Sequence, residues 1–238
     1  MMVGDQAEIA VKKWGRTETT FVVWAGIALA VLILTALVLH ASFPLFTVIW
    51  LVVPLWIVIR RANAHHVGFR GISWSKFVST GAINLSLLLL VSILVEPWSH
   101  AYQALVRGAV SGTPPDSTFA WLVRFSGLKA WGGLILYSGL VTMFAEELFF
   151  RGWLLQTFLS RMNKVWAIFI QAALFTLPQL LAAFLLSPLQ GVVYAVIYSW
   201  LAIGVIGGWA AMRTQSIWPS LASATLWNAI MVALVMKY

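Results

Sequence analysis

The sequence contains no cysteine and few charged residues. The absence of cysteine excludes disulfide bonds, thiolate catalysis and metal sites built on cysteine. Charged residues make up 9% of the 238 residues and hydrophobic residues make up 61%, whereas soluble domains contain about 25% charged residues. These proportions exclude an ordinary soluble domain and indicate an integral membrane protein.

Histidine is also scarce, with four residues, all within the first 100 positions: His40, His65, His66 and His100. We interpret them as loop or interface residues, because His65 and His66 are adjacent in a basic loop and the other two fall at the ends of apolar runs. The H-E-x-x-H pattern is absent, and two carboxylates without imidazole make a poor zinc site. We therefore expect no catalytic metal and no cofactor.

The net charge of +8 raises the question of a nucleic-acid partner. A nucleic-acid interface needs a continuous basic stripe on a folded surface, but here the basic residues form short clusters that flank apolar runs. This is the pattern of the positive-inside rule, so we expect membrane lipids as partners, no nucleic acid, a cytoplasmic N-terminus and an external C-terminus. The clusters are Lys12, Lys13, Arg16, Arg60, Arg61, Arg70, Lys76, Arg161, Lys164 and Arg213.

The apolar runs predict a single membrane domain over residues 1–238 with an all-α fold, a polytopic transmembrane bundle of about seven to eight helices. A crossing takes about 20 apolar residues. An eighth crossing could lie within 97–130, the second run is short enough for a re-entrant hairpin, and the N-terminal run is expected to stay as an anchor because no cleavage site follows it. Gly204 and Gly208 form a G-x-x-x-G motif that predicts close helix packing. The seven runs are about 20–40, 43–59, 77–95, 131–150, 165–187, 191–211 and 216–236.

The stretch FAEELFFRGWLL places Glu146, Glu147 and Arg151 in otherwise apolar surroundings. A charge at bilayer depth costs from about 3 to over 10 kcal/mol, so such residues usually serve a function. On a helix, Glu147 and Arg151 are i,i+4 neighbours and can form an ion pair. Glu146 points about 100° away from them, which leaves it without a local partner. The alternative is that both acids sit at the inner membrane boundary. Against this alternative, the stretch GWLLQTFL predicts that the helix continues for two to three more turns beyond the acids.

Polar side chains also occur at comparable depth on neighbouring runs. Gln171, Phe175 and Gln179 follow i, i+4, i+8 spacing in the fifth run, and Asn228 lies in the seventh. Buried glutamine and asparagine are commonly hydrogen-bonding residues between helices, so this structural interpretation stays open beside a catalytic one.

These motifs together resemble a known family. The order E-E-x-x-x-R, then F-x-x-x-polar about 25 residues later, then x-x-x-N after SIWPS resembles the CAAX prenyl protease and bacteriocin-processing family (CPBP or Abi) of intramembrane glutamate endopeptidases. The resemblance covers about residues 130–235. It implies that Glu146 is the catalytic base, that Glu147 and Arg151 form an orienting pair, and that Asn228 is an oxyanion donor.

Two positions depart from the family pattern, because Gln179 and Ala224 stand where the family has histidine. Glutamine can hold a water molecule but cannot shuttle a proton near pH 7. Acid–base assistance is worth about 10²–10⁴-fold, and one oxyanion donor about 10²–10³-fold. The departures therefore bear directly on activity.

We expect a CAAX-protease-like endopeptidase, with Glu146 and Gln179 as an altered catalytic pair, that acts on a membrane-embedded or lipidated peptide or protein in a bacterial plasma membrane. One alternative is a catalytically inactive family member that binds a peptide, an isoprenoid lipid or a membrane protein as a scaffold or immunity factor. A second alternative is a small transporter, in which the acids would line a solute path.

Overall fold

The computed structural model describes residues 45–61, 63–94, 141–184 and 186–237, together with a few residues between 16 and 27. Within these residues the regular structure is entirely helical, which confirms the predicted all-α class. The predicted first span, apart from those few residues, and the segment 97–130 lie outside the described residues.

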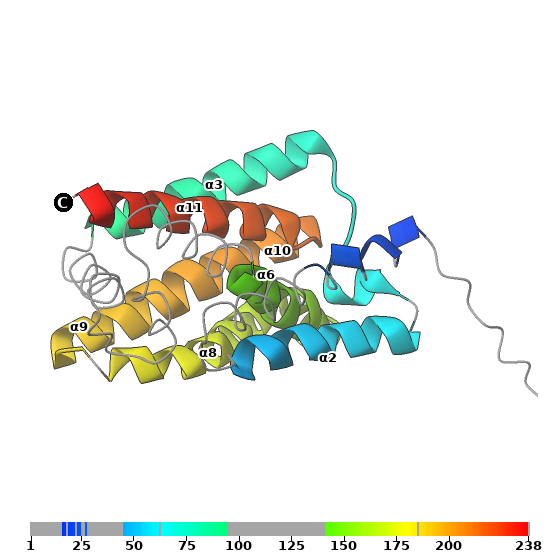
Figure 1. Ribbon diagram of the computed structural model, residues 1–238, viewed down its shortest axis with the longest axis horizontal. Helices are drawn as coiled ribbons and strands as arrows, with labels where there is room; N and C mark the ends of the chain where they lie inside the picture. Colours follow the sequence, from blue (N-terminus) through cyan, green and yellow to red (C-terminus); the bar gives the residue numbers. More distant parts are fainter. Residues whose placement is uncertain are drawn as a thin grey trace, which may run out of the picture.

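The described elements follow one another as long helices with short connections (Figure 1). The first half contributes three elements: α2 (Leu45–Arg61), the short 3₁₀ helix η1 (Ala64–Val67) and α3 (Trp74–Leu94). The second half begins with one continuous helical run made of α6 (Met143–Glu146), the π-helix η4 (Glu147–Leu154) and α7 (Leu155–Leu159). It continues with α8 (Lys164–Ala183), then α9 (Pro188–Val193), the π-helix η5 (Tyr194–Ile206), α10 (Gly207–Thr214) and finally α11 (Trp218–Lys237).

Five of the predicted spans coincide with helices, and the fourth is described only from residue 141 onward. The helical run continues past the acids to Leu159, as the stretch GWLLQTFL predicted. Within this run Arg151 is paired with Glu147 inside the protein. The short second run forms the single helix α2, with Pro54 inside it, instead of a re-entrant hairpin.

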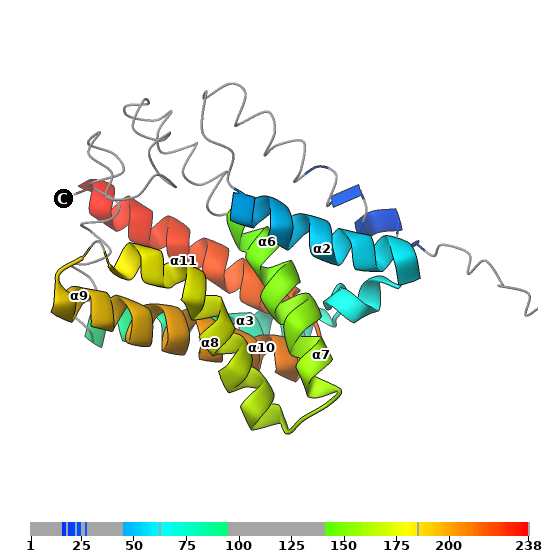
Figure 2. The same cartoon turned by 90° about the horizontal axis from the view of Figure 1, so that it is seen from below.

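Two helices of the described part are long and apolar enough to cross a membrane, Trp74–Ile93 and Pro188–Thr214, and a shorter apolar helix covers Lys164–Leu180. The first of these, α3, packs along α11, and the second packs along α8 (Figures 1 and 2). Together with the helical run of α6, η4 and α7, these elements enclose the polar residues of interest.

The predicted G-x-x-x-G motif does serve close packing. A Cβ added at Gly204 would lie 2.7 Å from the Cβ of Ala172, and one added at Gly208 would lie 2.8 Å from the Oε1 of Gln171. Both neighbours belong to α8. The absence of side chains at these two positions therefore lets η5 and α10 approach α8 directly, which is the usual use of this motif between helices.

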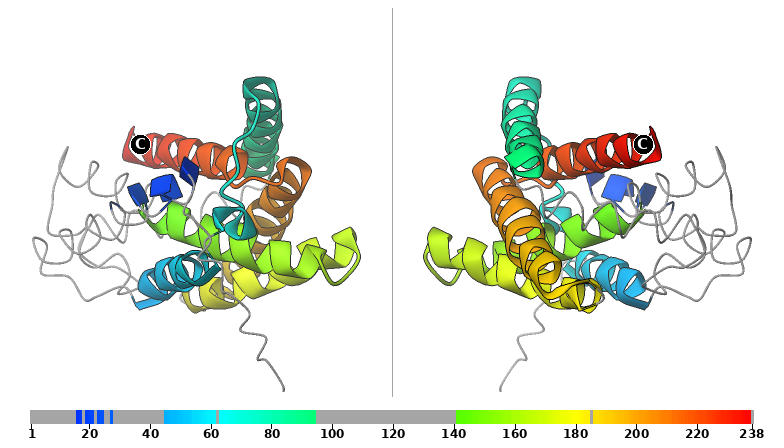
Figure 3. Two further views of the ribbon diagram at one scale, coloured as in Figure 1. Left: turned by 90° about the vertical axis from the view of Figure 1, so that its right-hand side faces the viewer. Right: turned by 90° about the vertical axis from the view of Figure 1, so that its left-hand side faces the viewer.

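A compact turn between α2 and α3 anchors one end of the bundle. Asn63 caps η1 by accepting a hydrogen bond from the amide of His65, and Gly68 ends it in the left-handed conformation at a φ of 68°. The carbonyl of Gly68 then accepts from the amide of Ile217 at 3.1 Å, and the Ser216 hydroxyl donates to the carbonyl of Arg70 at 2.9 Å. This turn and the α10–α11 connection therefore lie at the same end of the protein (Figure 3).

Candidate functional site

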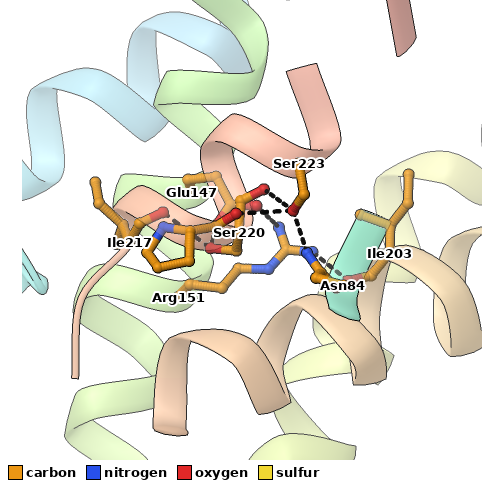
Figure 4. A network of polar contacts seen from close by, with 8 residues as sticks. Asn84, Glu147, Arg151, Ile203, Ile217, Ser220 and Ser223 are labelled. Atoms are coloured by element: carbon orange, nitrogen blue, oxygen red, sulfur yellow. Dashed lines mark hydrogen bonds and ion pairs between the residues drawn. The ribbon is translucent and has the colours of Figure 1, made fainter. Parts of the chain in front are cut away.

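Glu147 and Arg151 form a buried ion pair within a network of polar contacts (Figure 4). The Nη1 of Arg151 is 3.3 Å from the Oε1 of Glu147, and both side chains are almost fully buried. The Nη2 of Arg151 donates to the carbonyl of Ile203 at 2.7 Å, and its guanidinium carbon lies 4.3 Å from the centre of the Phe175 ring. The predicted i,i+4 pair is therefore present, and two further helices complete its surroundings.

Three residues that the sequence did not single out extend this pair into a network. The Ser220 hydroxyl is 2.5 Å from the Oε2 of Glu147 and 3.0 Å from the carbonyl of Ile217. Asn84 on α3 donates to the hydroxyl of Ser223, which itself lies 2.8 Å from the carbonyl of Pro219 (Figure 4). The motif helix, α3 and α11 thus meet at one buried polar cluster.

The backbone around the two acids has an unusual register. Glu146 is the last residue of α6, and Glu147 begins the π-helix η4. Short π-helical stretches are rare and are frequently found at functional sites. Hydropathy carries no signal for this change of hydrogen-bond register, so sequence reasoning could not have found it.

Glu146 is buried, with 3% of its surface exposed. In the described part of the chain it has no hydrogen-bond partner, whereas Glu147 is held by Arg151 and Ser220. The motif therefore places two buried carboxyl groups beside a single buried guanidinium group. A buried carboxylate without a hydrogen-bond partner must be protonated, hydrated or paired, and the predicted role of Glu146 as the catalytic base stays a prediction.

The remaining predicted site residues are Gln179 and Asn228. Gln179 is half-buried and accepts a hydrogen bond from the Tyr194 hydroxyl at 3.1 Å. The Tyr194 ring lies 4.9 Å from that of Tyr198, which in turn lies 5.3 Å from Trp227. Asn228, the next residue, is buried. Contacting aromatic rings thus run from Gln179 to Trp227, and the convergence of Gln179 and Asn228 with Glu146 stays a prediction.

A small cavity adjoins the polar cluster. It offers about 10 Å³ to the centre of a water molecule, which is close to the space that one water needs. Ala224, at the position where the family pattern has histidine, lines this cavity together with Glu147. The complete lining is Asn84, Leu88, Glu147, Ala202, Ile203, Gly207, Ser220 and Ala224.

Sequence reasoning missed Asn84, Ser220, Ser223 and Tyr194. A weak signal existed for three of them: Asn84 is a lone amide within the apolar run of α3, and the two serines are spaced i,i+3 at the start of α11. Neither pattern indicates which residue would be the hydrogen-bond partner. Across the described residues, no three histidine, aspartate or glutamate side chains gather where they could hold a metal ion.

One family model matches most of the second half of the chain. Residues 128–230 match the model of the Rce1-like family, described as type II CAAX prenyl endopeptidase Rce1-like, and this confirms the resemblance read from the motifs. The matched range includes the acid motif, Gln179, Ala224 and Asn228, whereas Asn84 lies outside it. No curated protein and no solved structure matched the chain.

Proposed function

We propose that this chain, which carries an Rce1-like domain of the CAAX-protease type at residues 128–230, is a membrane endopeptidase that cleaves a membrane-embedded or lipidated peptide. The observation that carries the proposal is the buried set of Glu146, Glu147 and Arg151 within that domain. Burying three charged side chains is costly, and a purely structural ion pair would need only two of them.

In the proposed reaction Glu146 acts as the general base. It takes a proton from a water molecule while the water oxygen attacks the peptide carbonyl, and it returns that proton to the leaving amine as the C–N bond breaks. Arg151 compensates the charge of Glu147, which leaves Glu146 available for the proton. The Asn228 side chain would donate to the oxyanion.

Gln179 takes a different role from that of a histidine. Because the Tyr194 hydroxyl donates to its Oε1, the amide N–H groups of Gln179 are directed elsewhere and act as donors. Gln179 would therefore hold a water or a carbonyl oxygen without moving a proton. Loss of that assistance reduces the rate by about 10²–10⁴-fold, so we propose slow turnover.

A second candidate function is binding without cleavage. The observation in its favour is Ala224, which lines the cavity beside Glu147 and brings no polar group to it. Such a protein would retain the polar cluster for stability and bind a peptide, an isoprenoid lipid or a membrane protein as a scaffold or immunity factor. The Rce1-like match favours either candidate over a transporter.

For location, we propose a bacterial plasma membrane with the N-terminus in the cytoplasm. The basic residues support this orientation, because Arg60 and Arg61 end α2 and Arg213 lies in the last turn of α10. The Gly68–Ile217 hydrogen bond holds the connections after these two helices together. Basic residues thus gather at one end of the protein, as the positive-inside rule requires of a cytoplasmic face.

The two candidates differ in a cleavage assay with purified protein. We would offer a panel of lipidated and unmodified C-terminal peptides and detect products by mass spectrometry, with Glu146→Ala as the matched inactive variant. Slow cleavage that Glu146→Ala abolishes supports the endopeptidase. Saturable binding of a peptide or lipid with no cleavage supports the second candidate. Cleavage that is equal in both proteins would contradict the role of Glu146.

A further inference from the structure

The connection between α7 and α8 lies against α10 (Figure 2). Met162 at this connection and Met212 on α10 pack against the same buried apolar cluster. The connection is a tight turn, because the amides of Arg161 and Met162 both donate to the carbonyl of Phe158 at 2.9 Å. The turn and the last residues of α10 are therefore held side by side by apolar packing.

Three exposed cations flank this apolar cluster. Arg161 and Lys164 belong to the turn and the first residue of α8, and Arg213 follows Met212 on α10. The guanidinium carbon of Arg213 lies 5.4 Å from the centre of the Trp209 ring, which packs against the same cluster. The described part of the chain contains two acids, and both are buried. No carboxylate on the described surface therefore compensates these three positive charges.

An exposed apolar face of α8 begins two residues after Lys164. Trp166, Ile170, Ala173 and Leu177 are all exposed and follow one another at spacings of four, three and four residues, so they lie along one side of the helix. Trp166, the first of them, is 64% exposed, and tryptophan is enriched at the headgroup level of membranes. Cations followed by an apolar face match the charged head and the acyl chains of a phospholipid.

We propose that Arg161, Lys164 and Arg213 bind the phosphate of an anionic phospholipid whose acyl chains lie along the exposed face of α8. Guanidinium groups suit phosphate because they can donate two parallel hydrogen bonds, and the lysine ammonium adds a point charge. A zwitterionic headgroup carries its own cation, so three uncompensated charges favour a lipid with a net negative head. The inference does not depend on whether the chain cleaves peptides.

Thermal melting of the purified protein in lipid vesicles tests the choice of ligand. The wild type is melted in phosphatidylcholine alone, in equal amounts of phosphatidylcholine and phosphatidylglycerol, and in phosphatidylcholine with added inorganic phosphate. We expect phosphatidylglycerol to raise the melting temperature by about 5 °C or more and inorganic phosphate to have little effect. No rise with phosphatidylglycerol, or an equal rise with inorganic phosphate, would overturn the proposal.

Two variants of equal charge locate the site. The first changes all three proposed cations to glutamine, and the second carries Arg60→Gln, Arg61→Gln and Lys76→Gln, at exposed positions on α2 and α3. We expect the first variant to lose most of the rise caused by phosphatidylglycerol and the second to keep it. Equal losses would mean that the lipid is attracted by overall charge, which overturns the site. If the first variant does not fold, Arg213→Gln alone decides, because an undiminished rise in that variant contradicts the proposal.

Discussion

The guanidinium carbon of Arg151 lies 4.3 Å from the centre of the Phe175 ring. This contact joins the acid motif to the second motif of the family pattern, which lies on α8. Together with the Glu147 carboxylate and the carbonyl of Ile203, the ring encloses the cation on three sides. Arg151 thus joins η4, η5 and α8. Without it the buried Glu147 carboxylate would lose its counter-charge.

We expect Arg151→Leu to destabilise the protein strongly. Removing one partner of a buried ion pair leaves the other charge unpaired and costs about 3–5 kcal/mol. Arg161→Leu is the matched control, because Arg161 is exposed in the turn between α7 and α8. Melting in detergent should show a large loss for the first variant and a small one for the second. Equal losses would mean that the pair is accessible to water.

Gly152, the residue after Arg151, should not tolerate a side chain. A Cβ there would collide with the backbone carbonyl of Val67 in η1, and neither backbone can yield without separating η1 from η4. We expect Gly152→Ala to lower the melting temperature clearly. Gly71→Ala, where no atom lies within 4 Å of the added Cβ, should leave it nearly unchanged, and a similar fall in both variants would contradict the close approach.

The Ser220 hydroxyl should contribute to stability through Glu147. Ser220→Ala leaves one carboxylate oxygen without its donor, which costs about 1–3 kcal/mol when the group is buried. The exposed Ser79, which donates only to the carbonyl of Lys76, serves as the control in Ser79→Ala. Thermal melting of both variants in the same detergent measures the difference, and no excess loss in Ser220→Ala would show that the contact is weak.

The fold could be predicted largely from hydropathy, because a membrane span is set by the length of an apolar run. The continuation of the helix past Arg151 could also be predicted, because the apolar pattern goes on in GWLLQTFL and Glu147 lies one turn before the arginine. The π-helical register of η4 and η5 could not, because it concerns backbone hydrogen bonds and leaves no trace in the hydropathy pattern.

The site was predictable only where its residues are close in sequence. The Glu147–Arg151 pair follows from i,i+4 spacing on a helix. Asn84 and Ser220 meet partners that lie 139 and 73 residues away, and a single sequence contains no signal for such distant contacts. Likewise, the hydrogen bond from Tyr194 to Gln179 depends on how η5 packs against α8.

Ala224→His, which would install the histidine of the family pattern, should not be tolerated as a single change. The cavity at this position has room for about one water, so an imidazole would overpack the site, at a cost of about 1–3 kcal/mol. We expect lower thermal stability and no gain in cleavage. A variant that melts like the wild type would show that α3 and α11 can separate at this point.

The central claim is that Glu146 is the base of a glutamate endopeptidase that lacks its proton shuttle. The most direct measurement is the initial rate of cleavage of a lipidated peptide by the wild type, by Gln179→His, and by Gln179→His combined with Glu146→Gln. Position 179 is half-buried, so the imidazole can be accommodated. We predict a gain of about tenfold or more in the single variant, toward the lower end of acid–base assistance, and its complete loss in the combined variant. A gain that survives Glu146→Gln, or an efficient wild type that histidine impairs, would contradict this claim.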